Sequence, residues 1–146
     1  MKRIRMLGVV GFVGVMATGP AMAQEEVFDA AWFRLEVNPL PGDGNYEVIA
    51  EPGYANHHIW CWAGNYAQAY LKVPATTRVY LMTPVGPAKT KARRRGVGFT
   101  VNPSPEVKAK DSRPGQGGNY SISISKVGYN LSIGHTRNFC DIDLGN

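Results

Sequence analysis

The alternation of apolar and polar residues along the chain predicts about six short strands. Phe33, Leu35 and Val37 alternate with charged residues at the end of segment 28–37, which is typical of a half-buried strand. The last two predicted strands could instead form one long strand that bends at Gly128. The other predicted strands cover residues 46–51, 77–83, 95–101, 119–125 (with Tyr120, Ile122 and Ile124 on its buried face) and 127–133.

Helical spacing occurs in one segment. Trp62, Tyr66, Ala69 and Val73 recur at intervals of three or four residues, so we expect an amphipathic helix over about 61–73 that ends before Pro74. Segment 102–118 is rich in proline, glycine and charge and predicts an exposed loop. One helix inserted between strand pairs predicts the α+β class, a small antiparallel sheet of about five or six strands with the helix packed on one face.

Residues 1–23 have the pattern of a secretory signal peptide. Three basic residues precede the apolar stretch 6–17, and Ala21-Met22-Ala23 offers a cleavage site. The apolar stretch is shorter than the roughly 20 residues that a membrane-spanning helix needs. We therefore expect a single disulfide-stabilised domain at residues 24–146, periplasmic or secreted, with no transmembrane segment after cleavage of the signal.

The net charge of the chain falls once the signal peptide is removed, and this changes which partner it suggests. The whole chain carries a formal +5, and loss of three cations with residues 1–23 leaves +2. Nucleic acid is a poor partner for an exported protein, so we expect an anionic lipid, glycan or protein partner, although the cations could simply line a solvated loop. The cations gather between residues 89 and 113: Lys89, Lys91, Arg93, Arg94, Arg95, Lys108, Lys110 and Arg113.

Cys61 and Cys140 are the two cysteines of the chain. Disulfides form and persist in the compartments that exported proteins reach, and an even number of cysteines in such a protein indicates a bridge. We therefore expect one disulfide between Cys61 and Cys140.

The run Trp60-Cys61-Trp62-Ala63 before the predicted helix resembles the nucleophile region of papain-like cysteine peptidases. The resemblance implies a thiol hydrolase in which Cys61 attacks, His135 acts as base and Asn138 or Asp141 orients it. The glutamine that supplies the oxyanion hole in that family is missing, and a bridge to Cys140 would consume the nucleophile. This enzyme is the alternative interpretation, not the leading one.

Histidines and aromatic residues near Cys61 raise two further hypotheses. His57, His58, Cys61 and His135 are metal-ligand types, but their spacing does not follow the paired pattern of a structural zinc site, so we expect no metal and no cofactor. Trp60 with His57 and His58 lies before the expected helix, and we expect this set to be exposed for binding.

Most of residues 28–140 resembles a family of small exported proteobacterial proteins with two cysteines, for which no activity is known. The resemblance implies export and the two-cysteine layout. The leading interpretation is a non-enzymatic exported domain that binds an anionic partner through the basic segment, and a structural envelope protein is a further alternative. The segments that carry the resemblance are 60–67, 77–81, 94–100 and 119–135.

Overall fold

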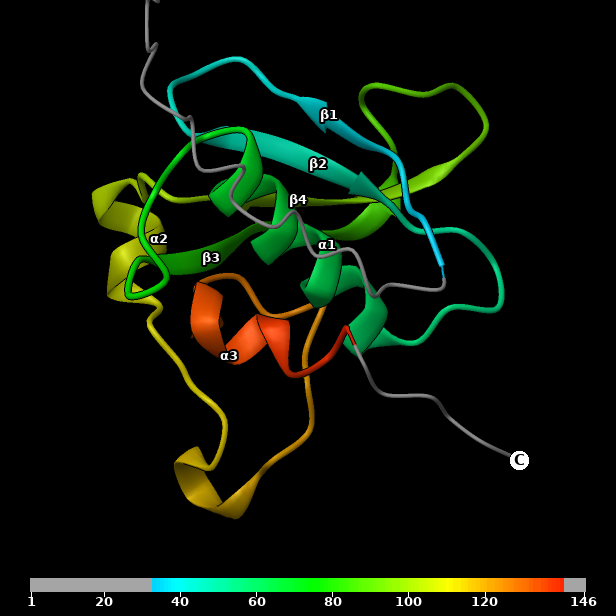
Figure 1. Cartoon of the computed structure of the whole chain (residues 1–146). Helices are drawn as coiled ribbons and strands as arrows, with labels where there is room; N and C mark the ends of the chain where they lie inside the picture. Colours follow the sequence, from blue (N-terminus) through cyan, green and yellow to red (C-terminus); the bar gives the residue numbers. More distant parts are fainter. Residues whose placement is uncertain (1–32, 141–146) are drawn as a thin grey trace, which may run out of the picture.

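The computed structural model describes residues 33–140 and shows an α+β fold (Figure 1). One antiparallel sheet of five strands has the order β1-β2-β4-β3-β5. The predicted signal peptide and the start of the expected domain lie outside the described residues. The strands are β1 (Val37–Pro39), β2 (Asn45–Ile49), β3 (Arg78–Pro87), β4 (Arg95–Thr100) and β5 (Asn130–Ser132), and the helices are α1 (Asn56–Ala69), α2 (Pro105–Ala109), the 3-10 helix η1 (Gln116–Gly118) and α3 (Ile133–Arg137).

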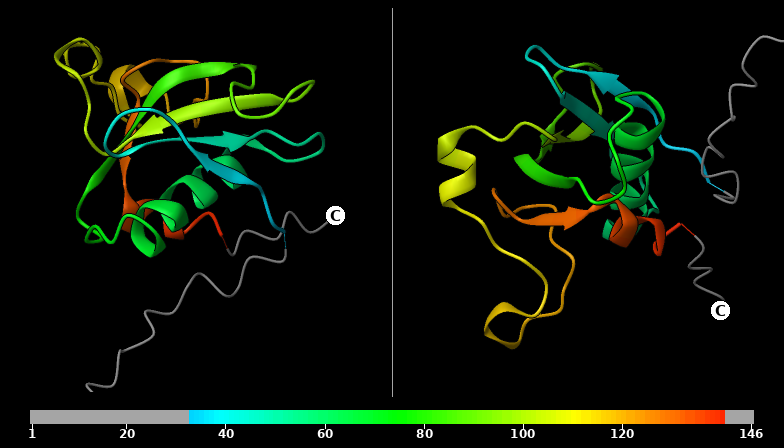
Figure 2. Two further views of the ribbon diagram at one scale, coloured as in Figure 1. Left: turned by 90° about the horizontal axis from the view of Figure 1, so that it is seen from above. Right: turned by 60° about the vertical axis from the view of Figure 1, so that its left-hand side comes forward.

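The hydrophobic core lies between the sheet and α1. Figure 2 shows α1 and α3 on the same side of the sheet. Trp60 of α1 is fully buried, and its ring lies edge-on to Phe99 of β4 with 4.8 Å between the centroids. Tyr46 of β2 is also fully buried and donates its hydroxyl to Ala63 O at 2.8 Å. Burial, with a smaller contribution from the neighbouring Tyr66, raises the pKa of Tyr46 well above its ordinary value.

Helix α1 confirms the expected helix but lies earlier in the chain than residues 61–73. It begins at Asn56, where the Nδ1 atom of His58 accepts a hydrogen bond from Ala55 N–H at 2.9 Å. It ends at Ala69, and Lys72 then takes a left-handed φ of 56° before Pro74. A residue that precedes proline disfavours helical angles, so the chain leaves the helix before it reaches Val73.

Segment 119–125 was predicted as a strand, and this prediction was wrong. Side chains of α1 take two of the carbonyls that a partner strand would need. Asn56 Nδ2 donates to Ile122 O at 2.9 Å, and Trp60 Nε1 donates to Ser123 O at 2.8 Å. Tyr120, expected on the buried face, is 76 % exposed. The segment is therefore tied to α1 through side chains and contributes no strand to the sheet.

The predicted strand 127–133 is also corrected, because β5 ends at Ser132 and α3 begins at the next residue. Ser132 Oγ accepts a hydrogen bond from His135 N–H at 3.2 Å and thereby caps the helix. Gly128 has a φ of +86° and forms a bend, as one interpretation of the sequence expected. A second short helix, α2, lies within the predicted loop 102–118 and is capped by Ser104.

The first described strand preserves the predicted alternation although β1 itself is short. Phe33 and Leu35 are buried, whereas Arg34 and Glu36 are exposed. Pairing with β2 starts only at Val37. The alternation of burial is thus confirmed, whereas the strand bounds 28–37 are not, and residues 28–32 lie outside the described part of the chain.

A disulfide between Cys61 and Cys140 joins α1 to the residues after α3, as the sequence predicted. The two helices also meet at Gly64, where a Cβ atom would lie 1.8 Å from Thr136 Oγ1. Thr136 is fully buried and donates its hydroxyl to Ile133 O at 2.7 Å, so it has little freedom to move aside. Only glycine fits at this point of α1.

We expect Gly64→Ala to lower the free energy of unfolding by about 2 kcal/mol, because overpacking a rigid contact costs more than the helix gains from alanine. Gly134→Ala in α3 is the matched control, since its Cβ would meet Ala75 O at an ordinary 3.5 Å. Urea denaturation of both variants measures the difference. Equal effects would contradict the close contact between Gly64 and Thr136.

Candidate functional site

The hairpin that connects β3 and β4 holds five of the eight predicted cations. We call residues 88–95 the basic hairpin; this segment contains no acidic residue. Ala88 N–H donates to Arg94 O at 2.8 Å and closes its loop. Arg93 has a φ of 60°, so the turn is made by a residue other than glycine. The five cations are Lys89, Lys91, Arg93, Arg94 and Arg95.

A buried carboxylate anchors the basic hairpin to the sheet. Glu47 of β2 is only 3 % exposed, and its two oxygens accept hydrogen bonds from the backbone N–H groups of Lys89 and Thr90, each at 2.9 Å. The Thr90 hydroxyl donates to the same carboxylate at 2.6 Å. Gly96 of β4 makes room for this arrangement, because a Cβ there would lie 2.6 Å from Glu47 Oε1. The backbone at the base of the hairpin is therefore held in one conformation.

Two of the five cations have acidic neighbours. Lys91 contacts Glu36, and Arg94 lies 3.9 Å from Glu51. Hydrogen bonds from Asn38 and then from Lys91 lower the pKa of the Glu36 carboxyl below its ordinary value. Within residues 33–140, the other three cations make no ion pair, and all three are exposed: Lys89, Arg93 and Arg95.

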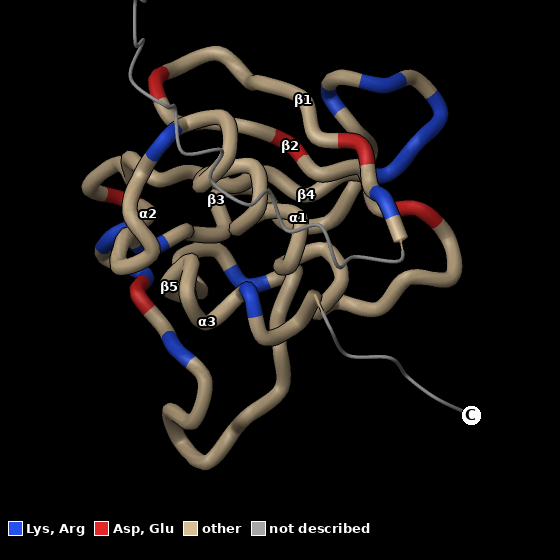
Figure 3. Tube along the Cα trace, in the orientation of Figure 1, with Lys and Arg blue, Asp and Glu red and all other residues tan. Residues whose placement is uncertain are grey.

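The structure does not bring all eight predicted cations together. Figure 3 shows the basic hairpin and helix α2 at opposite ends of the sheet. Lys108, Lys110 and Arg113, which we call the α2 cluster, lie on or after that helix and are exposed. Arg113 lies 3.6 Å from Asp111 and lines a separate polar hollow of about 370 Å³. One continuous basic segment of the sequence is thus two separate surfaces.

The residues of the thiol hydrolase alternative are not arranged for that chemistry. Cys61 is fully buried and bonded to Cys140, so its sulfur is not a thiol. His135 and Asn138 are exposed on and after α3, and the His135 ring packs 5.3 Å from that of Phe139. Asp141 lies outside the described residues. A bridged sulfur cannot attack a carbonyl, so Cys61 has no nucleophile to offer while the disulfide is intact.

His57, His58 and Trp60 were expected to be exposed before the helix, but all three lie within α1. Trp60 is fully buried and His58 is 2 % exposed, because α1 begins before them and turns both toward the interior. Burial lowers the pKa of His57 and of His58, with a further contribution to His58 from its neighbour. In the described part of the chain, no three His, Cys, Asp or Glu side chains form a group that could hold a metal ion.

No family model, curated protein or solved structure matches this chain. The resemblance to small exported proteobacterial proteins therefore stays a prediction. Over residues 33–140, no helix has the length and apolar character needed to cross a bilayer.

Glu47 is the residue of the site that the sequence interpretation missed. The segment 46–51 was predicted as a strand, and no role was assigned to Glu47. The signal lay in its cross-strand neighbours, since Glu47 pairs with Gly98 and lies beside Gly96 of β4. The missing side chain of Gly96 leaves space for the Glu47 carboxylate, whereas the space over Gly98 is taken by Thr83 of β3.

Proposed function

We propose that this chain is an exported, non-enzymatic domain that binds an anionic envelope component through the basic hairpin. The observation that carries the proposal is the anchoring of five cations on one hairpin by the buried carboxylate of Glu47. The Cys61–Cys140 disulfide supports export, because such bridges persist in oxidising compartments.

The geometry favours binding at the hairpin over binding at the α2 cluster. The exposed side chains of Lys89, Arg93 and Arg95 have no ion-pair partner among residues 33–140, so their charge is available to an incoming anion. Their backbone is already ordered, which reduces the conformational entropy lost on binding. Arginine side chains also bind phosphate and carboxylate groups with two parallel hydrogen bonds.

We expect reversal of Lys89, Arg93 and Arg95 to glutamate to weaken binding to vesicles that contain phosphatidylglycerol by about 100-fold or more. Each cation near an anionic surface contributes about 1 kcal/mol, and reversal replaces attraction with repulsion. Cosedimentation with the vesicles measures the affinity, and the salt needed to elute the protein from a heparin column tests an anionic glycan in the same way. The difference between wild type and variant shrinks as salt rises, because salt screens exposed charges.

Reversal of the α2 cluster is the matched control. Replacement of Lys108, Lys110 and Arg113 with glutamate changes the net charge by the same amount, but on helix α2 and the residues that follow it. A small loss in this control supports a site at the basic hairpin. Equal losses in both variants would show that only net charge matters and would contradict the proposal, as would unchanged binding in the hairpin variant.

A further inference from the structure

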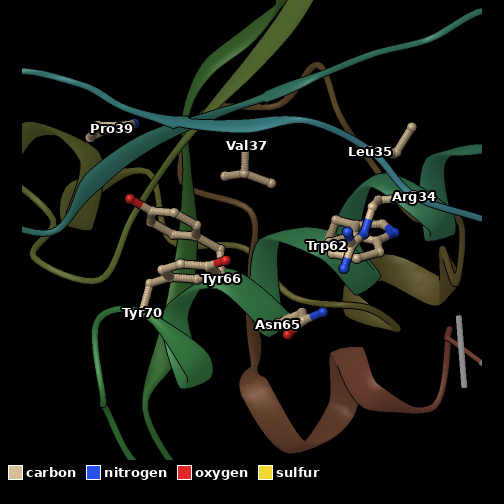
Figure 4. A pocket seen from close by; sticks show the side chains of 8 residues that line it. All are labelled: Arg34, Leu35, Val37, Pro39, Trp62, Asn65, Tyr66 and Tyr70. Carbon is tan, nitrogen blue, oxygen red and sulfur yellow. The ribbon is translucent and has the colours of Figure 1, made fainter. Parts of the chain in front are cut away.

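A second candidate site lies at the edge of the sheet, in a pocket of about 430 Å³ between β1 and α1 (Figure 4). Leu35, Val37 and Pro39 line it from the β1 side. Residues two apart in an extended chain share one face, and residues three or four apart on a helix do the same, so two rows of side chains face each other here. On the side of α1 the pocket is lined by Trp62, Asn65, Tyr66 and Tyr70.

Asn65 is the unusual member of this pocket. Its side chain is 2 % exposed, yet neither Nδ2 nor Oδ1 has a hydrogen-bond partner. Figure 4 shows that Asn65 extends from α1, with the Trp62 ring on one side of it and the rings of Tyr66 and Tyr70 on the other. Buried polar groups are nearly always paired, and leaving one unpaired costs stability. An amide with a free donor and a free acceptor in a pocket indicates a ligand that supplies both.

Arg34 sets the charge of the pocket. Its guanidinium lies 5.9 Å from the centroid of the Trp62 ring, and it makes no ion pair with any residue from 33 to 140. The residues that line the pocket include no acid. A carboxylate is the natural partner of an unpaired guanidinium, because the two planar groups form parallel hydrogen bonds.

The remaining surface of the pocket is aromatic and apolar. Tyr66 and Tyr70 stack with 5.1 Å between their ring centroids, and Tyr70 is 74 % exposed. An exposed aromatic stack beside a polar anchor favours an apolar side chain of a ligand. A ligand that matches this pocket therefore carries three groups, namely a carboxylate, an amide and an apolar group.

We propose that this pocket binds the carboxy-terminal end of a peptide, an activity separate from the anionic contact of the basic hairpin. Arg34 holds the terminal carboxylate, and Asn65 accepts from a peptide N–H and donates to a peptide carbonyl. The last side chain of the peptide packs against Trp62, Tyr66 and Tyr70. An N-acylated amino acid carries the same three groups and is the smallest ligand of this chemistry.

Three small probes separate these contacts. N-acetylphenylalanine carries all three groups, 3-phenylpropanoate lacks the amide, and N-acetylphenylalanine amide lacks the carboxylate. We expect the wild-type chain to bind N-acetylphenylalanine about tenfold more tightly than either of the other two probes. One net hydrogen bond changes the dissociation constant by about a factor of ten. NMR titration of the ¹⁵N-labelled protein measures this, with the indole N–H of Trp62 as the reporter. A longer peptide with the same end binds more tightly if peptides, and not free acyl amino acids, are the ligands.

Two variants assign the contacts. Asn65→Leu abolishes the preference for the probe with an amide, and Arg34→Gln abolishes the preference for the carboxylate. Asn65→Leu also raises the melting temperature, because it removes an unpaired buried amide, so a loss of binding in this variant cannot come from unfolding. A lower melting temperature would show that Asn65 has a structural role and would overturn the proposal. So would the absence of any shift at Trp62, or a carboxylate-dependent shift confined to residues 88–95, which would assign the carboxylate to the basic hairpin.

Discussion

Replacement of Cys61 and Cys140 together with alanine should lower the free energy of unfolding by about 4.5 kcal/mol. The bridge closes a loop with a sequence separation of 79 residues, and loops of this length lose much conformational entropy in the unfolded state when cross-linked. Both cysteines are buried, so the variant also loses packing at the junction of α1 with the chain after α3. Small domains are stable by only about 5–15 kcal/mol, and the variant should therefore be close to unfolding at 37 °C.

Urea denaturation of the oxidised protein, the reduced protein and the double-alanine variant measures this effect. The reduced protein and the variant should show similar midpoints, well below that of the oxidised protein. Mass spectrometry without reductant should find no free thiol in the native protein. A loss below about 1 kcal/mol would contradict a bridge that constrains the unfolded chain.

The second large effect is expected at Glu47. Glu47→Gln should lower the free energy of unfolding by about 3 kcal/mol, because hydrogen bonds to a charged group contribute about 1.5–3 kcal/mol and the new amide points its own hydrogens at a backbone donor. The substitution should also destabilise the basic hairpin locally, beyond its effect on the whole domain. Hydrogen exchange at the N–H groups of Lys89 and Thr90, which donate to this carboxylate, should accelerate more than exchange in α1.

Glu36→Gln provides the control for Glu47→Gln. Glu36 is exposed and contacts Lys91 of the same hairpin, so its loss should leave stability nearly unchanged. If both substitutions had the same small effect, the Glu47 carboxylate would not anchor the hairpin. Vesicle binding should fall in Glu47→Gln although no cation is removed, which links the anchor to the proposed function.

Much of the fold could be predicted from residue patterns of two kinds. The alternation at Phe33 and Leu35 follows burial, because both side chains lie in the core. The spacing of Trp62 and Tyr66 predicted the helix, although these two side chains are only partly buried and the core face of α1 is made by Trp60, Cys61, Ala63 and Ala67. The disulfide followed from the number of cysteines and the expected compartment.

Features that depend on tertiary contacts could not be predicted in this way. Helix α3 has five residues, too few for a periodic pattern, and its start depends on the cap by Ser132. Residues 119–125 alternate like a strand, but Trp60 and Asn56 bond to their carbonyls. The sequence also could not show that the basic hairpin and helix α2 lie at opposite ends of the sheet, nor that Asn65 is buried without a hydrogen-bond partner.

The order of the strands has a consequence for how the domain assembles. Hairpins β1–β2 and β3–β4 are local in sequence and need only short loops to close. The pairing that joins them, Val48 with Val97, links residues far apart in the chain, and Cys140 lies further on still. Such non-local contacts form late and slow the folding of a domain. A growing chain that has not reached residue 140 can form its hairpins but cannot complete its covalent closure.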